Sequence, residues 1–150
     1  QKYHSVLMQA PRTLSQAVFF QGCGDPEVYP RPGGETYVTG MPDPPAIVDE
    51  LPGEVRVDAT VVERLTSAAR AVSTELREAN VTGRQSCYLP IAGRGLPVVG
   101  ELAGSPHVFV ATGHGCWGIL NAPATGKALA ELIVDGQATT VSLDPFKPRD

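Results

Sequence analysis

A glycine-rich turn between an apolar run and a long helical pattern constrains the fold of this chain most. Residues 107–111 read HVFVA, Gly113, Gly115 and Gly118 follow, and residues 119–134 repeat apolar side chains at helical spacing. This order predicts a strand, a tight turn and a helix. Glycine has no Cβ, so the main chain can approach a ligand closely, and a helix N-terminus favours negative charge. We therefore expect the turn to hold an electron-rich cofactor that carries a ring or a phosphate.

The chain before this turn predicts an α+β fold, an antiparallel sheet with a covering helix. Strands that follow one another through short connections pair antiparallel, and Pro32-Gly33-Gly34 predicts a hairpin. Asp58 predicts the start of a helix that Asn80 and Gly83 are expected to end. The expected strands cover residues 3–9, 16–21, 27–31, 35–39, 55–57 and 85–89, the helix covers 58–79, and loops cover 41–54 and 90–100. The later helix is expected to bury Ala122, Ala128, Leu129, Leu132 and Ile133, to end at Gly136 and to precede an extended tail over 143–150.

Composition narrows the class of protein. The net charge of −4 and the lack of a Lys/Arg cluster argue against nucleic acid as a partner. No apolar run approaches the roughly 20 residues of a membrane-spanning helix. Cys23, Cys87 and Cys116 are odd in number and far apart, which favours a reducing, intracellular location, cytoplasmic or organellar, over a disulfide framework. The chain opens on Gln1 inside an alternating pattern, so we expect the front of a longer protein, with any targeting segment, to be missing.

The glycine turn supports three interpretations. Gly113-x-Gly115-x-x-Gly118 matches the dinucleotide fingerprint, with Asp135 where a ribose-binding acid would be sought. That fold needs further βαβ units, however, and little chain remains after Gly136. Alternatively, the glycines only let the last helix pack tightly on its strand. Pro123 and Gly126 are costly in a helix, and they favour a site at which a ligand approaches the backbone.

Other side chains near the turn remain open. His114 is either a hydrogen-bond donor to the cofactor or a supporting residue. Trp117 is expected to pack against the strand or the cofactor edge. Cys116 has no paired base, so it is not expected to act as a nucleophile. His4 and His107 lie on strand-like runs, where surface or satisfied core positions are expected.

Several motifs together resemble one known family. They are Cys87-Tyr88-Leu89-Pro90, Gly95-Leu96-Pro97-Val98-Val99-Gly100, Ala111-Thr112-Gly113-His114-Gly115, Gly118-Ile119-Leu120, Ala122-Pro123-Ala124-Thr125-Gly126-Lys127 and Asp135-Gly136. They resemble the closing region of FAD-dependent oxidoreductases of the D-amino-acid oxidase type, which include glycine and sarcosine oxidases. The hairpin from Val28-Tyr29-Pro30-Arg31 to Tyr37-Val38-Thr39-Gly40 also resembles the substrate-domain sheet of that family.

The resemblance implies that the turn belongs to an FAD site. In such enzymes an amino-terminal half carries the dinucleotide fold, and that half is expected to be absent from this chain. Residues 1–104 would form the substrate-domain sheet and helix, and residues 105–150 would complete the FAD-binding domain. The residues expected to face the flavin are Thr112, Gly113, His114, Gly115, Gly118 and Ile119. The full-length protein would oxidise a small amine or amino acid by hydride transfer to flavin, whereas the fragment alone is expected to be inactive.

The resemblance also suggests substrate contacts, with departures. Tyr37 and Tyr88 are candidate lining residues, because arginine and tyrosine of the sheet domain often hold the substrate carboxylate in this family. The family often has an arginine where Leu89 stands and an acid where Arg94 stands. Arg94 is therefore either a substitute carboxylate ligand or a solvated loop residue. No catalytic residue and no metal site is assigned. The missing arginine also fits a second hypothesis, a non-catalytic assembly or scaffold protein that keeps the oxidoreductase fold.

Overall fold

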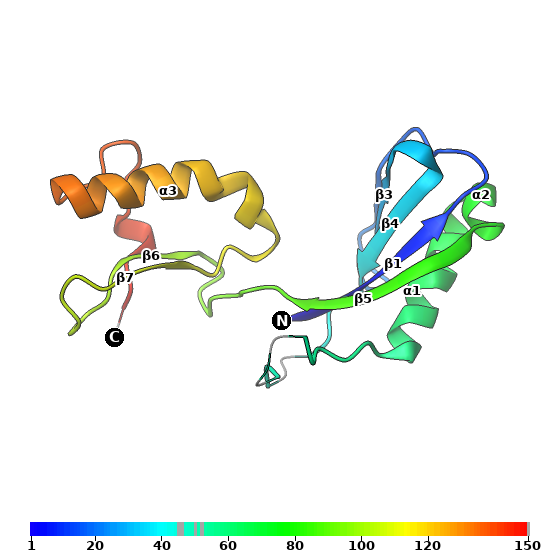
Figure 1. The fold of residues 1–150 in the computed structure, drawn as a ribbon, viewed down its shortest axis with the longest axis horizontal. Helices are drawn as coiled ribbons and strands as arrows, with labels where there is room; N and C mark the ends of the chain where they lie inside the picture. The colour runs from blue at the N-terminus through cyan, green and yellow to red at the C-terminus, as the bar shows by residue number, and fades with distance from the viewer. Residues whose placement is uncertain (45–46, 50, 52, 150) are drawn as a thin grey trace. The chain divides into compact units, whose positions relative to one another are not determined.

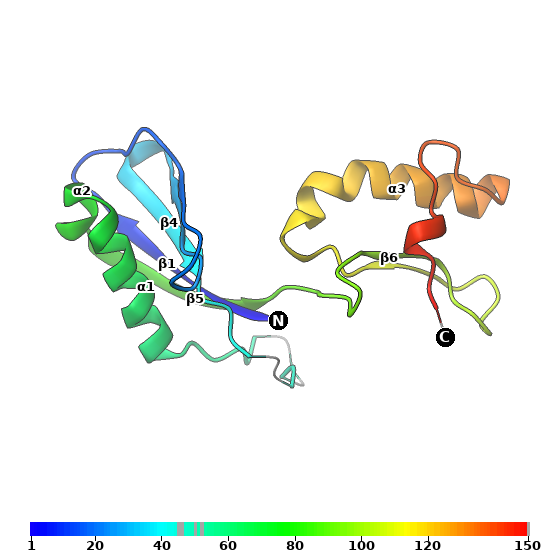
Figure 2. The same ribbon diagram turned by 180° about the vertical axis from the view of Figure 1, so that it is seen from behind.

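The chain forms two compact units, Gln1–Tyr88 and Leu89–Asp150, which we call the sheet unit and the turn unit. The computed structural model describes residues 1–44, 47–49, 51 and 53–149 (Figures 1 and 2). Part of the predicted loop over 41–54 and the last residue of the predicted tail therefore lie outside the described residues.

The sheet unit is built on a five-stranded antiparallel sheet in the order β2-β3-β4-β1-β5. Two helices follow β4 and precede β5. The elements are β1 (Lys2–Gln9), β2 (Val18–Phe19), β3 (Glu27–Pro30), β4 (Glu35–Gly40), α1 (Ala59–Val72), α2 (Thr74–Arg77) and β5 (Asn80–Tyr88). The predicted hairpin joins β3 to β4, with Gly33 at φ 84° and Gly34 at φ 86°. The predicted α+β class, a sheet with a covering helix, is confirmed.

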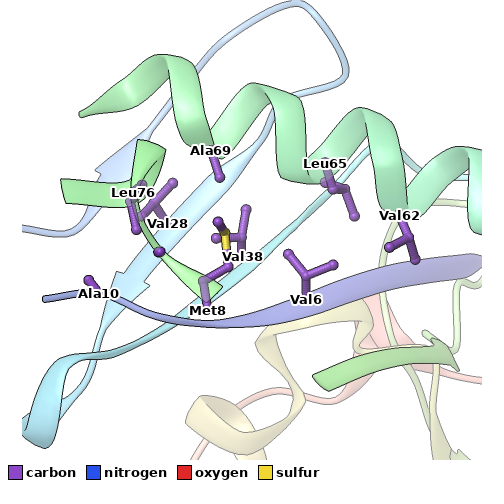
Figure 3. Packing of buried hydrophobic residues seen from close by; sticks show 10 residues of the cluster. Val6, Met8, Ala10, Val28, Val38, Val62, Leu65, Ala69 and Leu76 are labelled. Carbon is purple, nitrogen blue, oxygen red and sulfur yellow. The ribbon is translucent and has the colours of Figure 1, made fainter. Parts of the chain in front are cut away.

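The core of the sheet unit lies between α1 and one face of the sheet (Figure 3). Val6, Val38 and Leu65 are fully buried there. The other members are Met8, Ala10, Val28, Val62, Ala69, Leu76 and Ala79. Because successive strand residues point to opposite faces, Tyr29 and Tyr37 lie on the face opposite α1, which we call the outer face. A register shift between Leu7 and Met8 places one extra residue in β5, a β-bulge.

Three predictions in this unit were wrong. The helix expected over 58–79 does start after Asp58, whose Oδ1 accepts hydrogen bonds from the Thr60 and Val61 amides, but it breaks at Ser73. Ser73 is extended (φ −151°, ψ 157°), and its hydroxyl accepts a hydrogen bond from the Leu76 amide, which caps α2. The second helix, α2, ends at Arg77, before the predicted end at residue 79. Asn80 and Gly83, which were expected to end the helix, lie in β5 and pair with Gln9 and Leu7. Residues 55–57 form no strand; the Ser86 hydroxyl donates to the Arg56 carbonyl (3.0 Å) instead.

The turn unit holds a two-stranded antiparallel sheet and a long helix. Its elements are β6 (Val98–Glu101), β7 (Phe109–Thr112), α3 (Gly118–Asp135) and the short 3₁₀ turns Gly115–Trp117 and Asp144–Phe146. The predicted helix end is confirmed, because Gly136 takes the left-handed conformation (φ 75°) at its C-cap. Val99, Ala128 and Leu143 are the buried residues of a small core, with Leu129, Leu132, Ala138 and Phe146 packed partly against it.

The turn unit also corrects several expectations. The strand predicted from residue 107 begins at Phe109, because His107 is left-handed (φ 64°) and its amide donates to the Glu101 carboxylate. Ala122 and Ile133 of the expected stripe are exposed. The tail contains a 3₁₀ turn at Asp144–Phe146 and is not wholly extended. Residues 98–101 form β6 and pair with β7, whereas the sequence predicted a loop up to residue 100. The division into a substrate domain over 1–104 and an FAD-domain segment over 105–150 stays a prediction.

Candidate functional site: the glycine turn and the start of α3

The glycine turn adopts the predicted strand–turn–helix geometry. β7 ends at Thr112, Gly113 is left-handed (φ 79°), and Gly115 (φ 56°) opens a 3₁₀ turn that leads into α3. Such positive φ values are strained for residues with a Cβ. Residues 112–119 therefore form one continuous corner of main chain, which holds the predicted flavin-facing residues Thr112, Gly113, His114, Gly115, Gly118 and Ile119.

One side of this corner is covered by the preceding loop. A Cβ on Gly113 would lie 2.8 Å from the Cβ of Ala92, and the Gly115 amide donates to the Pro90 carbonyl (3.0 Å). Ile91 also forms an isolated β-bridge with His114. Packing of the loop is therefore enough to require glycine at 113. A Cβ at Gly118 would meet the His114 side chain only at 3.6 Å, an ordinary contact, and one at Gly126 would meet nothing within 4 Å.

The start of α3 is accessible and polar. No side chain caps its N-terminus, whose N-cap residue is Trp117. Ile119 is 95% exposed and Trp117 is 63% exposed, so most of the Trp117 side chain is accessible. The first N–H groups of a helix have no partner within the helix, and they attract negative charge. This end of α3 can accept an anionic or electron-rich group.

His114 is held within the turn unit. Its Nε2 lies 3.1 Å from the hydroxyl of Thr125, which belongs to α3. The imidazole also lines a cavity of about 230 Å³ with Pro97, Val99, Asn121, Ala124, Thr125, Val141, Leu143 and Phe146. This contact ties the turn to α3 and gives His114 a supporting role, and contact with flavin stays a prediction.

Two of the three candidate substrate residues lie on opposite faces of the sheet, and the third belongs to the turn unit. Tyr37 lies on the outer face of the sheet, paired with Leu7 and Tyr29. Tyr88 pairs with Lys2 and therefore lies on the same face as His4, the face that α1 covers. Arg94 belongs to the turn unit, is exposed, and donates to the Lys147 carbonyl (3.4 Å). Their contact with substrate stays a prediction.

Tyr88 is linked to an acid. Its hydroxyl donates to the Asp49 carboxylate (2.9 Å). Partial removal from water raises the pKa of Tyr88, and the hydrogen bond to Asp49 raises it further. Tyr88 therefore stays protonated and acts as a hydrogen-bond donor.

Sequence reasoning missed two arrangements in the sheet unit. Only one ring nitrogen of the buried His4 has a hydrogen-bond partner among the described residues: Nε2 accepts from the Asp58 amide (2.9 Å). The other, Nδ1, lies 3.7 Å from the Asp43 carboxylate and forms no hydrogen bond there. Burial lowers the pKa of His4. The second arrangement is a row of aromatic side chains on the outer face, Phe19, Tyr29 and Tyr37. The sequence could have indicated that Glu27 shares this face, because it lies two residues before Tyr29 on β3.

Two classes of site lack support. In the described part of the chain, no group of three or more His, Cys, Asp or Glu residues could hold a metal ion. No helix among the described residues has the length and apolar character needed to cross a membrane.

Comparison with known proteins identifies the family. A family profile described as FAD dependent oxidoreductase (DAO) matches residues 1–132. The chain belongs to this family. FAD is the cofactor of the family, as the motifs implied. A glycine oxidase of Geobacillus kaustophilus (strain HTA426) is 31% identical over 97% of the chain, and the protein named "Putative oxidoreductase C1F5.03c" of Schizosaccharomyces pombe (strain 972 / ATCC 24843) is 36% identical over 98%.

Two solved structures share this fold. The crystal structure of glycine oxidase from Geobacillus kaustophilus superposes on 99% of the chain with a TM-score of 0.83 and 30% identity. An L-proline dehydrogenase from P. horikoshii shares the fold with a TM-score of 0.79 over 97% of the chain. The chain spans 40% of the fission yeast relative, 36% of the glycine oxidase relative and 38% of each of the two solved chains.

Proposed function

We propose that the whole protein carrying this chain oxidises an amine or amino acid, with FAD as the electron acceptor. The observation that carries the proposal is the exposed start of α3, uncapped by any side chain, directly after the glycine turn. In a chain of this family, that corner suits the electron-rich flavin. When bound, FAD would accept a hydride from the carbon that bears the nitrogen.

The residues of the corner would hold and polarise the cofactor. The first N–H groups of α3 would stabilise negative charge on the flavin by roughly 0.3–2 kcal/mol. Thr112, Ile119 and the main chain of Gly113, Gly115 and Gly118 would line the cofactor. His114 would keep the turn in place through Thr125. The sheet unit would supply substrate contacts, with Tyr37, Tyr88 and Arg94 still candidates.

The remaining partner in this proposal is the N-terminal FAD-binding half of the same protein. The chain spans only about two fifths of its fission yeast relative. Ile119, Leu120 and Val134 on α3 are 95%, 71% and 80% exposed. Exposed apolar side chains at both ends of one helix suit a surface that another segment covers. The added half would bury them and complete the cofactor site, so the chain alone would be inactive.

The test uses the whole protein. A yellow preparation with a flavin absorbance band that bleaches when an amine or amino acid is added without oxygen supports the proposal. Ile119→Glu should lower flavin occupancy, because the charge enters the cofactor corner. Val108→Glu, the same type of change at an exposed position outside α3, is the control and should retain more flavin. A colourless protein would reject the enzyme and favour the scaffold hypothesis suggested by Leu89.

A further inference from the structure

One carboxylate binds the tail of the turn unit to α3. Glu131 Oε2 accepts hydrogen bonds from the Thr139 amide (2.7 Å) and the Thr140 amide (2.8 Å), and its Oε1 accepts one from the Thr140 hydroxyl (2.6 Å). Hydrogen bonds to an ionised carboxylate are roughly twice as strong as those between neutral groups. Both oxygens of Glu131 are therefore used to hold residues 139–140 at the side of α3.

The chain that follows this contact packs on β6. Leu143 of this segment is buried in one cluster with Val99 of β6. Further along the chain, Pro148 Cδ lies where it would be 3.1 Å from a Cβ added at Gly100, also on β6. We call residues 139–148 the strap. The strap is thus fixed at its start by the carboxylate and along its length by packing.

The strap and the glycine turn border the same cavity. Val141, Leu143 and Phe146 of the strap line the cavity of about 230 Å³ described above. His114 lines it too, and its Nε2 lies 3.1 Å from the Thr125 hydroxyl. A side chain next to an enlarged void loses its packing contacts on that side. Movement of the strap would therefore remove support from His114, which is itself part of the corner.

We propose that Glu131 is a positioning residue of the flavin site, which acts through the strap and His114 on the glycine turn. The inference rests on the proposed function, in which this turn holds the flavin. Gly118 and Glu131 lie roughly 20 Å apart along the axis of α3, at about 1.5 Å of rise per residue. Glu131 therefore acts on the start of the helix indirectly, by keeping the strap on the cavity and the turn in one conformation.

The test measures the midpoint potential of the flavin in the whole protein. Glu131→Gln removes the charge and replaces one acceptor oxygen by an NH₂ group, which cannot accept from the strap. The first N–H groups of α3 should then stabilise the anionic reduced flavin less. We expect binding of reduced flavin to weaken about tenfold relative to oxidised flavin, which lowers the two-electron potential by about 30 mV. Spectroelectrochemical titration measures this shift.

Matched variants separate this effect from a general loss of stability. Glu63→Gln is the same substitution at an exposed position of α1 and should leave the potential unchanged. Thr140→Val removes only the hydroxyl contact and should shift the potential in the same direction by less. Thr140→Ser keeps that hydroxyl and should keep the wild-type potential. This pair tests the strap even if Glu131→Gln does not fold.

The outcomes separate this inference from the proposed function. A flavin that amines or amino acids reduce, with the same potential in wild type, Glu131→Gln and Thr140→Val, overturns the inference and leaves the function standing. If the whole protein binds no flavin, the function fails, and the amide NMR signals of His114 and Gly115 decide about the strap. Signals that move in Thr140→Val and stay in Thr140→Ser support the coupling, and signals that stay in both overturn it.

Discussion

The two units of this chain differ in how they bury apolar side chains. The sheet unit closes a contiguous core between α1 and the sheet, in which Val6, Leu65 and Leu76 are fully buried. The turn unit buries only Val99, Ala128 and Leu143, and leaves most of α3 exposed. A small core contributes little to stability. The sheet unit thus has a larger core of its own than the turn unit, which under the proposed function would gain further contacts from the N-terminal half.

A core truncation in each unit tests this difference most strongly. Leu65→Ala should lower the free energy of unfolding of the sheet unit by about 2–5 kcal/mol, because it leaves a cavity under α1. Leu132→Ala, at a half-buried position in the turn unit, should cost about 1 kcal/mol or less. Urea unfolding followed by circular dichroism measures both. Equal losses would show that the turn unit has a core comparable to that of the sheet unit.

A pair of alanine substitutions tests the corner itself. Gly113→Ala should destabilise the turn unit by about 2 kcal/mol, because the residue is left-handed and its new Cβ would meet Ala92. Gly126→Ala in α3 meets nothing within 4 Å and should stabilise by about 0.5–1 kcal/mol. Thermal unfolding of the two variants measures the opposite signs. A neutral Gly113→Ala would mean that the loop at Ala92 yields easily.

Acid should weaken the sheet unit through His4. Burial lowers the pKa of His4 below 6.5, so the unfolded chain binds the proton more tightly than the folded one. Its contribution is complete above pH 6.5 and is lost as the pH falls from there toward the lowered pKa. Protonation of Nε2 also removes the acceptor for the Asp58 amide. The urea midpoint should fall over this window, and His4→Gln should flatten the dependence; an equally steep dependence in that variant would assign it to other groups.

The turn unit should show a smaller response, at much lower pH. Hydrogen bonds from Thr140 and Thr139 lower the pKa of Glu131 to about 2. The group therefore holds residues 139–140 against α3 at pH 4, where an ordinary glutamate takes up a proton. The amide signals of Thr139 and Thr140 should stay unchanged by NMR until the pH approaches 2–3. Movement of these signals near pH 4.5 would contradict the assigned contact.

Local patterns predicted much of the sheet unit and the shape of the corner. Alternation located β1, β3 and β4, and Asp58 located the start of α1, because these signals act within a few residues. The break at Ser73 was missed, since apolar spacing continues through Leu76 and hides a hydroxyl cap. The beginning of β5 was missed because Asn80 is typical of turns, and only pairing with Gln9 makes it a strand.

The site was less predictable, because distant partners decide it. The sequence indicated that the glycine turn was special, but it could not indicate that Ala92 fills the space beside Gly113. The candidate tyrosines were chosen by type and resemblance, and neither signal tells on which face of a sheet a residue lies. The row of Phe19, Glu27 and Tyr29 depends on pairing between β2 and β3, which spacing within one strand shows only in part.

The extra residue in β5 reverses the faces that the following side chains of the strand would otherwise occupy. Val81 and Arg84 line one hollow together with α1, although an odd and an even position would point apart in a regular strand. Every side chain from Arg84 to Tyr88 inherits this reversal. Removing Thr82 would restore strict alternation and leave each residue from Gly83 to Tyr88 opposite its present partner on β1. If all nine residues of β5 alternated without the bulge, Tyr88 would instead lie on the side of Tyr37. The extra residue thus decides which surface of the sheet each side chain in that half of the strand faces.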